Sequence, residues 1–248
     1  MLLELSLIVA AATSPKQAVA DAKPIRTVVY DVSYSRREEL TIGHFGGGAP
    51  MTSTDSAVSG PVGPGGQVTN TSDVGTITVD VYAVMKGTVV AVITEHWNGK
   101  SAPNVFKGAV NADGSLIGYP PEMNAVARAL LPAFGTHFSP EGVDLSSVGT
   151  TWRSIATPPE YDMETTFSVK RIDGEVVTLN ETLTARSKSP HAPDTTETGT
   201  IAYKPKILAP ISGDLHMRAL KSDENSADEI NLNLHFTRAS DTFDRAGA

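Results

Sequence analysis

The chain of 248 residues contains 21 glycines, 16 prolines and no cysteine, and its formal net charge is −8. The absence of cysteine excludes disulfide bonds, thiolate metal sites and thiol catalysis within this sequence. The negative charge disfavours nucleic acids and anionic membrane surfaces, so we expect no nucleic-acid partner. The length suits one large β-domain or two smaller ones and is sufficient to bury most of the apolar surface.

The first twenty residues are typical of an export signal. The apolar segment from Leu5 to Ala12 is too short to span a bilayer, and residues 18–20 form a small-x-small cleavage site. Glu4 occupies a position where signals carry a basic residue, so an ordinary first strand or helix is the alternative. We therefore predict a secreted or periplasmic bacterial protein, with residues 1–20 as the signal and with no integral membrane span.

Residues 25–36 alternate between apolar and polar side chains and predict a strand that extends toward Ile42. Its apolar face consists of Val28, Tyr30, Val32 and Tyr34. The next segment, residues 44–73, has few large apolar side chains, so burial cannot offset the entropy of ordering it. We expect a mobile loop there. A phosphate-binding loop at residues 46–48 is disfavoured, because the Lys and the helix that such loops need do not follow.

Two hairpins are predicted in the first half of the chain. Residues 76–85 and 88–97 alternate on either side of Lys86-Gly87, and residues 106–110 and 115–119 flank a turn at 111–114. The Asp-Gly pair in the second turn favours a turn over a cation loop, since no carboxylates follow at spaced positions.

Residues 120–134 predict the only convincing helix. Their apolar side chains recur at i, i+3, i+4, i+7, i+8 and i+11 and are Met123, Val126, Ala127, Leu130, Leu131 and Phe134. The Pro-Pro pair at 120–121 favours the helix start, and Pro132 and Gly135 favour its end. We expect Val126, Leu130 and Phe134 to face a sheet, and Asn124 and Arg128 to face away from it.

The second half of the chain predicts an antiparallel meander. A turn at residues 148–152 leads into a strand with Trp152 to bury, and Asp173-Gly174 predicts a hairpin turn. Alternating segments follow at residues 161–169, 177–185, 201–203, 211–217 and 230–236. We expect a polar loop over residues 188–197 and a frayed tail after Asp241.

These elements amount to a mainly β protein with one or two helices. We predict a strongly curved antiparallel sheet of about eleven strands, a half-barrel, with the helix covering its concave face. No linker separates two apolar cores, so residues 21–248 should form a single domain.

This order of elements resembles the half-barrel of the bacterial lipoprotein-carrier superfamily. Leu130-Leu131-Pro132, followed by a "VGxxW" strand at residues 148–152, also resembles uncharacterised secreted bacterial proteins. The resemblance covers about residues 25–238 and rests on element order and one short motif. It implies a hydrophobic concavity that holds an acyl chain, and it transfers no catalytic residue. The long Gly-rich loop departs from the pattern.

We therefore expect a non-catalytic protein that binds a lipid or another apolar small molecule, without cofactor or metal. The candidate lining residues are Met123, Val126, Leu130, Phe134, Tyr161, Met163, Phe167, Leu215, Met217, Leu232, Leu234 and Phe236. For each of them, packing in an ordinary core is the alternative. The ligand itself and the oligomeric state are not determined by these patterns.

Two other classes of function stay open. A hydrolase acting on an extracellular polymer would use outer-face carboxylates or histidines; Glu160, Asp162 and Glu164 are available, and Asp162 and Glu164 share the outer face. Residues 95–97 could form part of a polar site, with a strand end that carries an interfacial aromatic as the alternative. His216 and His235 could join Asp214 in a metal site across neighbouring strands. A structural or surface-assembly protein would pair through exposed strand edges. No G-x-S-x-G, H-E-x-x-H or Walker motif occurs in the sequence.

Overall fold

The computed structural model describes residues 23–42, 66–85, 88–112, 114–119, 123–134, 138, 140–157, 161–189, 192–205, 209–222 and 226–245. Within these residues, eleven strands form one antiparallel sheet in the order β5-β4-β3-β2-β1-β11-β10-β9-β8-β7-β6. The predictions of a mainly β protein and of about eleven antiparallel strands are confirmed. The predicted signal at residues 1–20 lies outside the described residues.

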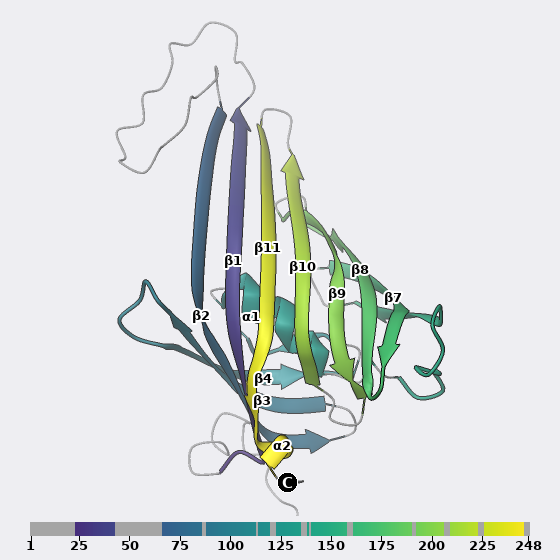
Figure 1. Ribbon diagram of the computed structural model, residues 1–248. Helices are drawn as coiled ribbons and strands as arrows, with labels where there is room; N and C mark the ends of the chain where they lie inside the picture. The colour runs from purple at the N-terminus through teal and green to yellow at the C-terminus, as the bar shows by residue number, and fades with distance from the viewer. Residues whose placement is uncertain are drawn as a thin grey trace, which may run out of the picture.

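The strands follow each other along the sheet almost as they follow each other in the chain (Figure 1). They are β1 (Arg26–Ile42), β2 (Gly66–Met85), β3 (Thr88–Trp97), β4 (Asn104–Val110), β5 (Leu116–Ile117), β6 (Thr151–Ala156), β7 (Tyr161–Asp173), β8 (Val176–Ser187), β9 (Asp194–Lys204), β10 (Ala209–Ser222) and β11 (Ser226–Asp241). The first strand and the last lie side by side in the middle of the sheet, and the sheet stays open between its edge strands β5 and β6.

The prediction of irregular structure is wrong in part for three segments. Residues 66–73 belong to β2 and pair with β1, for example Gln67 with Leu40. Residues 194–197 belong to β9, and residues 242–245 form a short helix, α2 (Thr242–Arg245). The first two segments are polar on both faces, so alternation could not reveal them, although ladder hydrogen bonds still satisfy their backbone. Residues 44–65 of the expected loop lie outside the described residues.

The predicted helix is shorter than its apolar pattern. It consists of α1 (Ala125–Leu130) and a 3₁₀ turn, η1 (Leu131–Phe134), that contains Pro132. The cap is Asn124, whose side-chain oxygen accepts a hydrogen bond from the backbone N–H of Val126 at 2.9 Å. An Asn cap satisfies an N–H that would otherwise lack a partner, so the helix begins at Ala125. The Pro-Pro pair at 120–121 lies outside the described residues.

One face of the sheet, here called the inner face, carries the buried side chains and contacts the helix. Val126, Leu130 and Phe134 are almost fully buried and join one hydrophobic cluster with side chains of the sheet. The ring of Tyr30 in β1 forms T-shaped contacts with Phe134 and with Phe236 in β11, with ring centroids 6.1 Å and 5.8 Å apart. The cluster spans both halves of the chain, because it includes residues from β2 and β3 as well as from β7 and β8.

At two glycines of the inner face, a large neighbouring side chain occupies the space where a Cβ would lie. A Cβ on Gly199 would lie 2.6 Å from Leu215 Cδ2, and one on Gly213 would lie 2.5 Å from the Phe236 ring. Both distances are shorter than van der Waals contact, so only glycine permits these side chains to fold down on the sheet.

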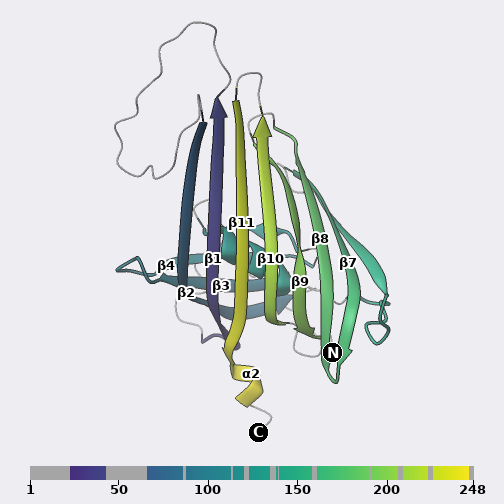
Figure 2. The same cartoon turned by 45° about the horizontal axis from the view of Figure 1, so that its top comes forward.

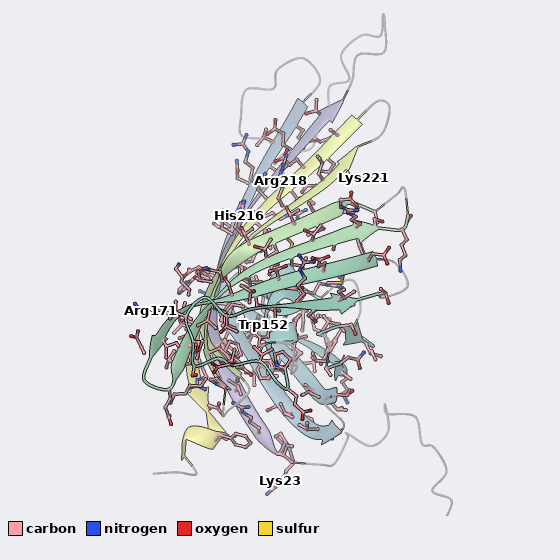
Figure 3. All side chains as sticks on the ribbon, turned by 90° about the vertical axis from the view of Figure 1, so that its right-hand side faces the viewer. Lys23, Trp152, Arg171, His216, Arg218 and Lys221 are labelled. Carbon is pink, nitrogen blue, oxygen red and sulfur yellow. The ribbon has the colours of Figure 1, made fainter. Side chains whose placement is uncertain are left out.

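The strands differ in how far they extend past the helix. In Figures 1 and 2, β1, β2, β10 and β11 continue well beyond the level of α1. Figure 3 shows Trp152 among the crowded side chains near the helix, whereas Arg218 and Lys221 lie farther along β10. Among the described residues, no helix has the length and apolarity needed to cross a membrane.

Candidate functional site on the inner face

The twelve predicted lining residues fall into two groups. Eight of them belong to the hydrophobic cluster that includes the helix: Met123, Val126, Leu130, Phe134, Phe167, Leu215, Leu234 and Phe236. The remaining four lie outside that cluster: Leu232 is buried, and Tyr161, Met163 and Met217 are half-buried. The first group is packed as core, whereas Tyr161, Met163 and Met217 of the second group retain access to solvent.

The helix presents the face that its periodicity predicts. Val126 and Leu130 are at most 1% exposed, while Asn124 and Arg128 are half-buried. The Arg128 side chain donates a hydrogen bond from Nε to the carbonyl of Met123 at 3.2 Å. The helix is therefore apolar toward the cluster and polar on the side that carries Arg128.

Beyond the helix, the inner face continues as an apolar surface on four strands, β7, β8, β10 and β11. Cross-strand partners define it: Leu232 pairs with Met217, Ile230 with Ala219, and Met163 with Ala185. We call this surface the distal inner face; it consists of Met163, Leu183, Ala185, Met217, Ala219, Ile230 and Leu232. None of these residues belongs to the cluster that includes the helix, and four of them are half-buried.

Two glutamates lie where the hydrophobic cluster meets the distal inner face. Glu181 in β8 pairs with Phe167 on one side and Gly199 on the other. Glu197 in β9 pairs with Leu183 and with Met217. The two positions are therefore diagonal neighbours on the same face, a spacing that long side chains bridge.

Both carboxyl groups are buried, Glu181 with 6% and Glu197 with 5% of its surface exposed. Burial raises the pKa of Glu197 to about 7. Burial also raises the pKa of Glu181 well above its ordinary value, and the neighbouring charge of Glu197 adds to this shift. Low-dielectric surroundings disfavour the charged form of a carboxyl group, and a second carboxylate disfavours it further.

Neither glutamate is compensated by the protein in the described part of the chain. No ion pair and no side-chain hydrogen bond joins either carboxyl group to a described residue. Thr165, which pairs with Leu183 in the next strand, is on the same face, and 8% of its surface is exposed. Three buried polar side chains thus surround Leu183 at one point of an apolar surface.

Sequence reasoning missed this group, although the sequence contains a signal for Glu181. The alternation Val177, Leu179, Leu183, Ala185 skips one position, and that position is Glu181. A carboxyl group at a position that the alternation assigns to the apolar face is expected to be buried. Glu197 carried no such signal, because its segment was assigned to a loop.

Glu95 is also a buried carboxylate, but hydrogen bonds compensate its burial and give it a structural role. It is 1% exposed, and its two oxygens accept hydrogen bonds from the Asn124 backbone N–H at 3.0 Å and the Trp97 indole at 3.3 Å. It therefore connects β3 to the start of the helix. The predicted polar site at residues 95–97 is explained by this connection.

The outer face carries the histidines that a metal site would need. His235 Nδ1 lies 2.7 Å from Asp214 Oδ1, as the prediction requires, but His216 Nδ1 contacts Asn233 Oδ1 at 2.8 Å instead. Among the described residues, no group of three or more acidic, histidine or cysteine side chains is arranged to hold a metal ion. Figure 3 shows His216 on β10.

These histidines line an open groove of about 860 Å³ across β2, β1, β11, β10 and β9. Its side chains are mostly short and polar, for example Ser35, Thr198 and Asn233. Thr237 Oγ1 lies 3.2 Å from His235 Nε2, which gives an acid–imidazole–hydroxyl row with Asp214. His235 and Asp214 are 54% and 74% exposed, so water screens the row and it is not desolvated for nucleophilic catalysis.

Asp162 and Glu164, two of the three carboxylates proposed for a hydrolase, are surface groups. Asp162 pairs with Lys188 at 2.9 Å and Glu164 with Arg153 at 3.2 Å, and all four side chains are well exposed. Glu160 lies outside the described residues. The groove that the outer-face histidines line does not include Glu181 or Glu197, and neither does a second groove lined by residues of β1, β2 and β11. Glu181 and Glu197 are the acids with raised pKa values.

Comparison with known proteins adds no assignment, since no family model and no curated protein matches the chain. The site is therefore judged by its own chemistry. It combines an apolar surface beyond the helix with buried acids, and it has no outer-face metal cluster among the described residues.

Proposed function

We propose that the sheet forms a half-barrel whose concave side is the inner face, partly covered by α1 and η1, and that it binds an apolar ligand there. The ligand is a lipid or another molecule with an alkyl chain, and the protein acts outside the cytoplasm as a non-catalytic carrier. The distal inner face carries this proposal, because its half-buried apolar side chains continue the buried face beyond the helix. Apolar surface that the fold leaves open is typical of a binding site.

The path of the strands supports a curved sheet. In Figures 1 and 2, β3 and β4 run across behind β1 and β11, with α1 at the same level. The glycines at 199 and 213 let Leu215 and Phe236 lie close to the backbone, which suits a surface that closes on itself. Long twisted sheets of this many strands curl rather than remain flat.

Assembly through strand edges, the structural alternative, has less support. The edge strand β5 has two residues and the edge strand β6 has six, and short edges give little surface for pairing. We therefore favour ligand binding over assembly through strand edges as the function.

The proposal is tested by extracting the purified protein with organic solvent and analysing the extract by mass spectrometry. Delipidated protein is then titrated with an alkyl probe such as dodecanol while its melting temperature is followed, since a ligand that binds the native state raises it. A matched pair of variants on β10 locates the site. Met217→Asn on the inner face should weaken binding by about tenfold or more, because it places an amide on the apolar surface. Leu220→Asn should leave binding unchanged, since Leu220 is exposed on the outer face.

Absence of a co-purified lipid together with no effect of any alkyl probe on melting would contradict the proposal. Equal effects of Met217→Asn and Leu220→Asn would place the site elsewhere.

A further inference from the structure

Two uncompensated carboxyl groups on an apolar face require an explanation. Removing a carboxyl group from water is unfavourable unless hydrogen bonds or an opposite charge compensate it. Glu95 has such compensation from Asn124 and Trp97, whereas Glu181 and Glu197 have none from the described residues. Packing against apolar neighbours does not compensate the hydration that these two carboxyl groups lose.

No described Lys, Arg or His side chain affects the pKa of Glu181 or Glu197. The inner-face cation on the same cross-strand row is Arg36 in β1, which β11 and β10 separate from Glu197. Arg36 forms an ion pair with Glu38 at 2.8 Å. The described part of the chain therefore supplies acids at this point and no cation to pair with them.

We propose that the apolar ligand carries a basic nitrogen, and that its ammonium group binds among Glu181, Glu197 and Thr165. A primary ammonium has three N–H donors and no acceptor, and the site offers two carboxyl groups and one hydroxyl. A carboxylate or phosphate head group would bring a third negative charge to two acids, which like-charge repulsion disfavours. This inference rests on the proposed function, because the alkyl chain would lie on the distal inner face.

Met217 and Leu183 are half-buried and flank Glu197 on its two sides. Each is the direct cross-strand partner of Glu197, Met217 in β10 and Leu183 in β8. Met has three rotatable side-chain bonds and adapts its shape readily. Entry of an alkylamine therefore requires rearrangement of these side chains and no change in the ladder of the sheet.

The test compares three probes with the same alkyl chain: dodecylamine, dodecanol and dodecanoic acid, each near neutral pH and below its micelle concentration. Wild-type protein should bind dodecylamine about tenfold or more tightly than dodecanol, since charge-assisted hydrogen bonds are stronger than neutral ones. Dodecanoic acid should bind more weakly than dodecanol. The double variant Glu181→Gln, Glu197→Gln should bind dodecylamine and dodecanol equally. Glu164→Gln, on the outer face of β7, should retain the wild-type preference.

Calorimetry of the wild-type protein gives a measurement that does not depend on a variant. Binding of an ammonium ion favours the ionised acids, so dodecylamine should release protons to the buffer and dodecanol should release none. Equal affinity for amine and alcohol, or a preference that survives in the double variant, would overturn the inference and leave the proposed function standing. Failure of all three probes to bind would remove both.

Discussion

Three glutamates on the inner face have different partners and therefore different consequences for stability. Glu95 accepts hydrogen bonds that connect β3 to the helix start. Glu181 and Glu197 have raised pKa values, caused mainly by burial, so the native state binds protons that the unfolded chain releases. Asp241 shows the opposite behaviour: although burial alone would raise its pKa, hydrogen bonds from Arg26 and the Phe243 backbone lower it.

Wild-type protein should lose stability as the pH rises from about 4.5 toward 7, because Glu197 has an ordinary pKa of 4.5 and a native pKa of about 7. Its contribution is fully present below the unfolded pKa and is lost as the pH rises through the native one; the loss is on the order of 3 kcal/mol. Glu181 acts in the same direction. Urea unfolding at pH 5 and pH 8 measures the difference, and Glu197→Gln should reduce it. Glu164→Gln is the control; an unchanged pH dependence in Glu197→Gln would contradict the assignment.

Asp241→Asn should destabilise the protein by about 3–5 kcal/mol, since removing one partner of a buried ion pair leaves charge without compensation. Asp241 Oδ1 accepts a hydrogen bond from Arg26 Nε at 3.1 Å, and its Oδ2 lies 3.1 Å from Arg238 Nη1. The side chain of Asp241 is fully buried. Urea unfolding measures the loss. Asp162→Asn, at an exposed ion pair on β7, is the matched control and should change stability by less than about 1 kcal/mol.

At the scale of elements, the helix and the inner-face glycines decide how the sheet packs. The α1–η1 segment is ten residues long, too short to be stable alone, and it depends on burial of Val126 and Leu130. Its start is determined by Asn124 and by Glu95, which comes from a strand far away in the sequence. The inner-face glycines affect the packing because they have no side chain, which leaves room for Leu215 and Phe236.

Leu130→Ala should cost about 2–5 kcal/mol, because it leaves a cavity under a helix that is packed as core. Leu130 is 1% exposed. Arg128→Ala should cost less than about 1 kcal/mol, since Arg128 is half-buried and water can replace the hydrogen bond that its Nε donates to the Met123 carbonyl. Urea unfolding of the two variants side by side measures the difference. Equal stability would show that the helix does not cover the sheet.

Gly199→Ala should destabilise the protein by about 1–3 kcal/mol, because the new methyl group overlaps Leu215 and the Asp214 carbonyl. Gly66→Ala is the control in β2, where a Cβ would lie at an ordinary 3.6 Å from the nearest atom. It should be neutral or slightly stabilising, since Ala restricts the unfolded chain. Thermal unfolding of both variants decides; a loss in Gly66→Ala as large as in Gly199→Ala would mean that crowding is not the cause.

At the scale of the whole molecule, one buried cluster connects the two halves of the chain. It includes Trp97 in β3 and Trp152 in β6, which lie in opposite halves of the strand order. The pairing of β1 with β11 joins the first described strand to the last. Contacts of this kind couple the unfolding of distant segments.

The two tryptophans report on the two halves separately. In Trp152→Phe the fluorescence follows Trp97, and in Trp97→Phe it follows Trp152. If residues 21–248 form one domain, each variant should show the same urea midpoint by fluorescence as by circular dichroism, because a single core unfolds cooperatively. Two midpoints within either variant would divide the chain into two domains and contradict the single-domain prediction.

The sequence by itself determined the class of fold and the identity of most strands. Segments such as residues 161–169 and 230–236 alternate so regularly that one buried face is the only consistent interpretation, and the chain order of antiparallel neighbours follows from their short connections. The same local patterns predicted which side of the helix would be buried, because a period of 3.6 residues separates Val126 and Leu130 from Arg128.

Only the tertiary structure decided the features that depend on contacts between distant residues. Residues 66–73 and 194–197 are strands because β1, β8 and β10 pair with them, although their own side chains carry no apolar alternation. The helix starts at Ala125 because Asn124 caps it and Glu95 holds that cap. Glu181 and Glu197 are neighbours only because β8 pairs with β9 in this register. The register sets the burial of each carboxyl group and its distance from the other charge, and these two quantities determine its pKa.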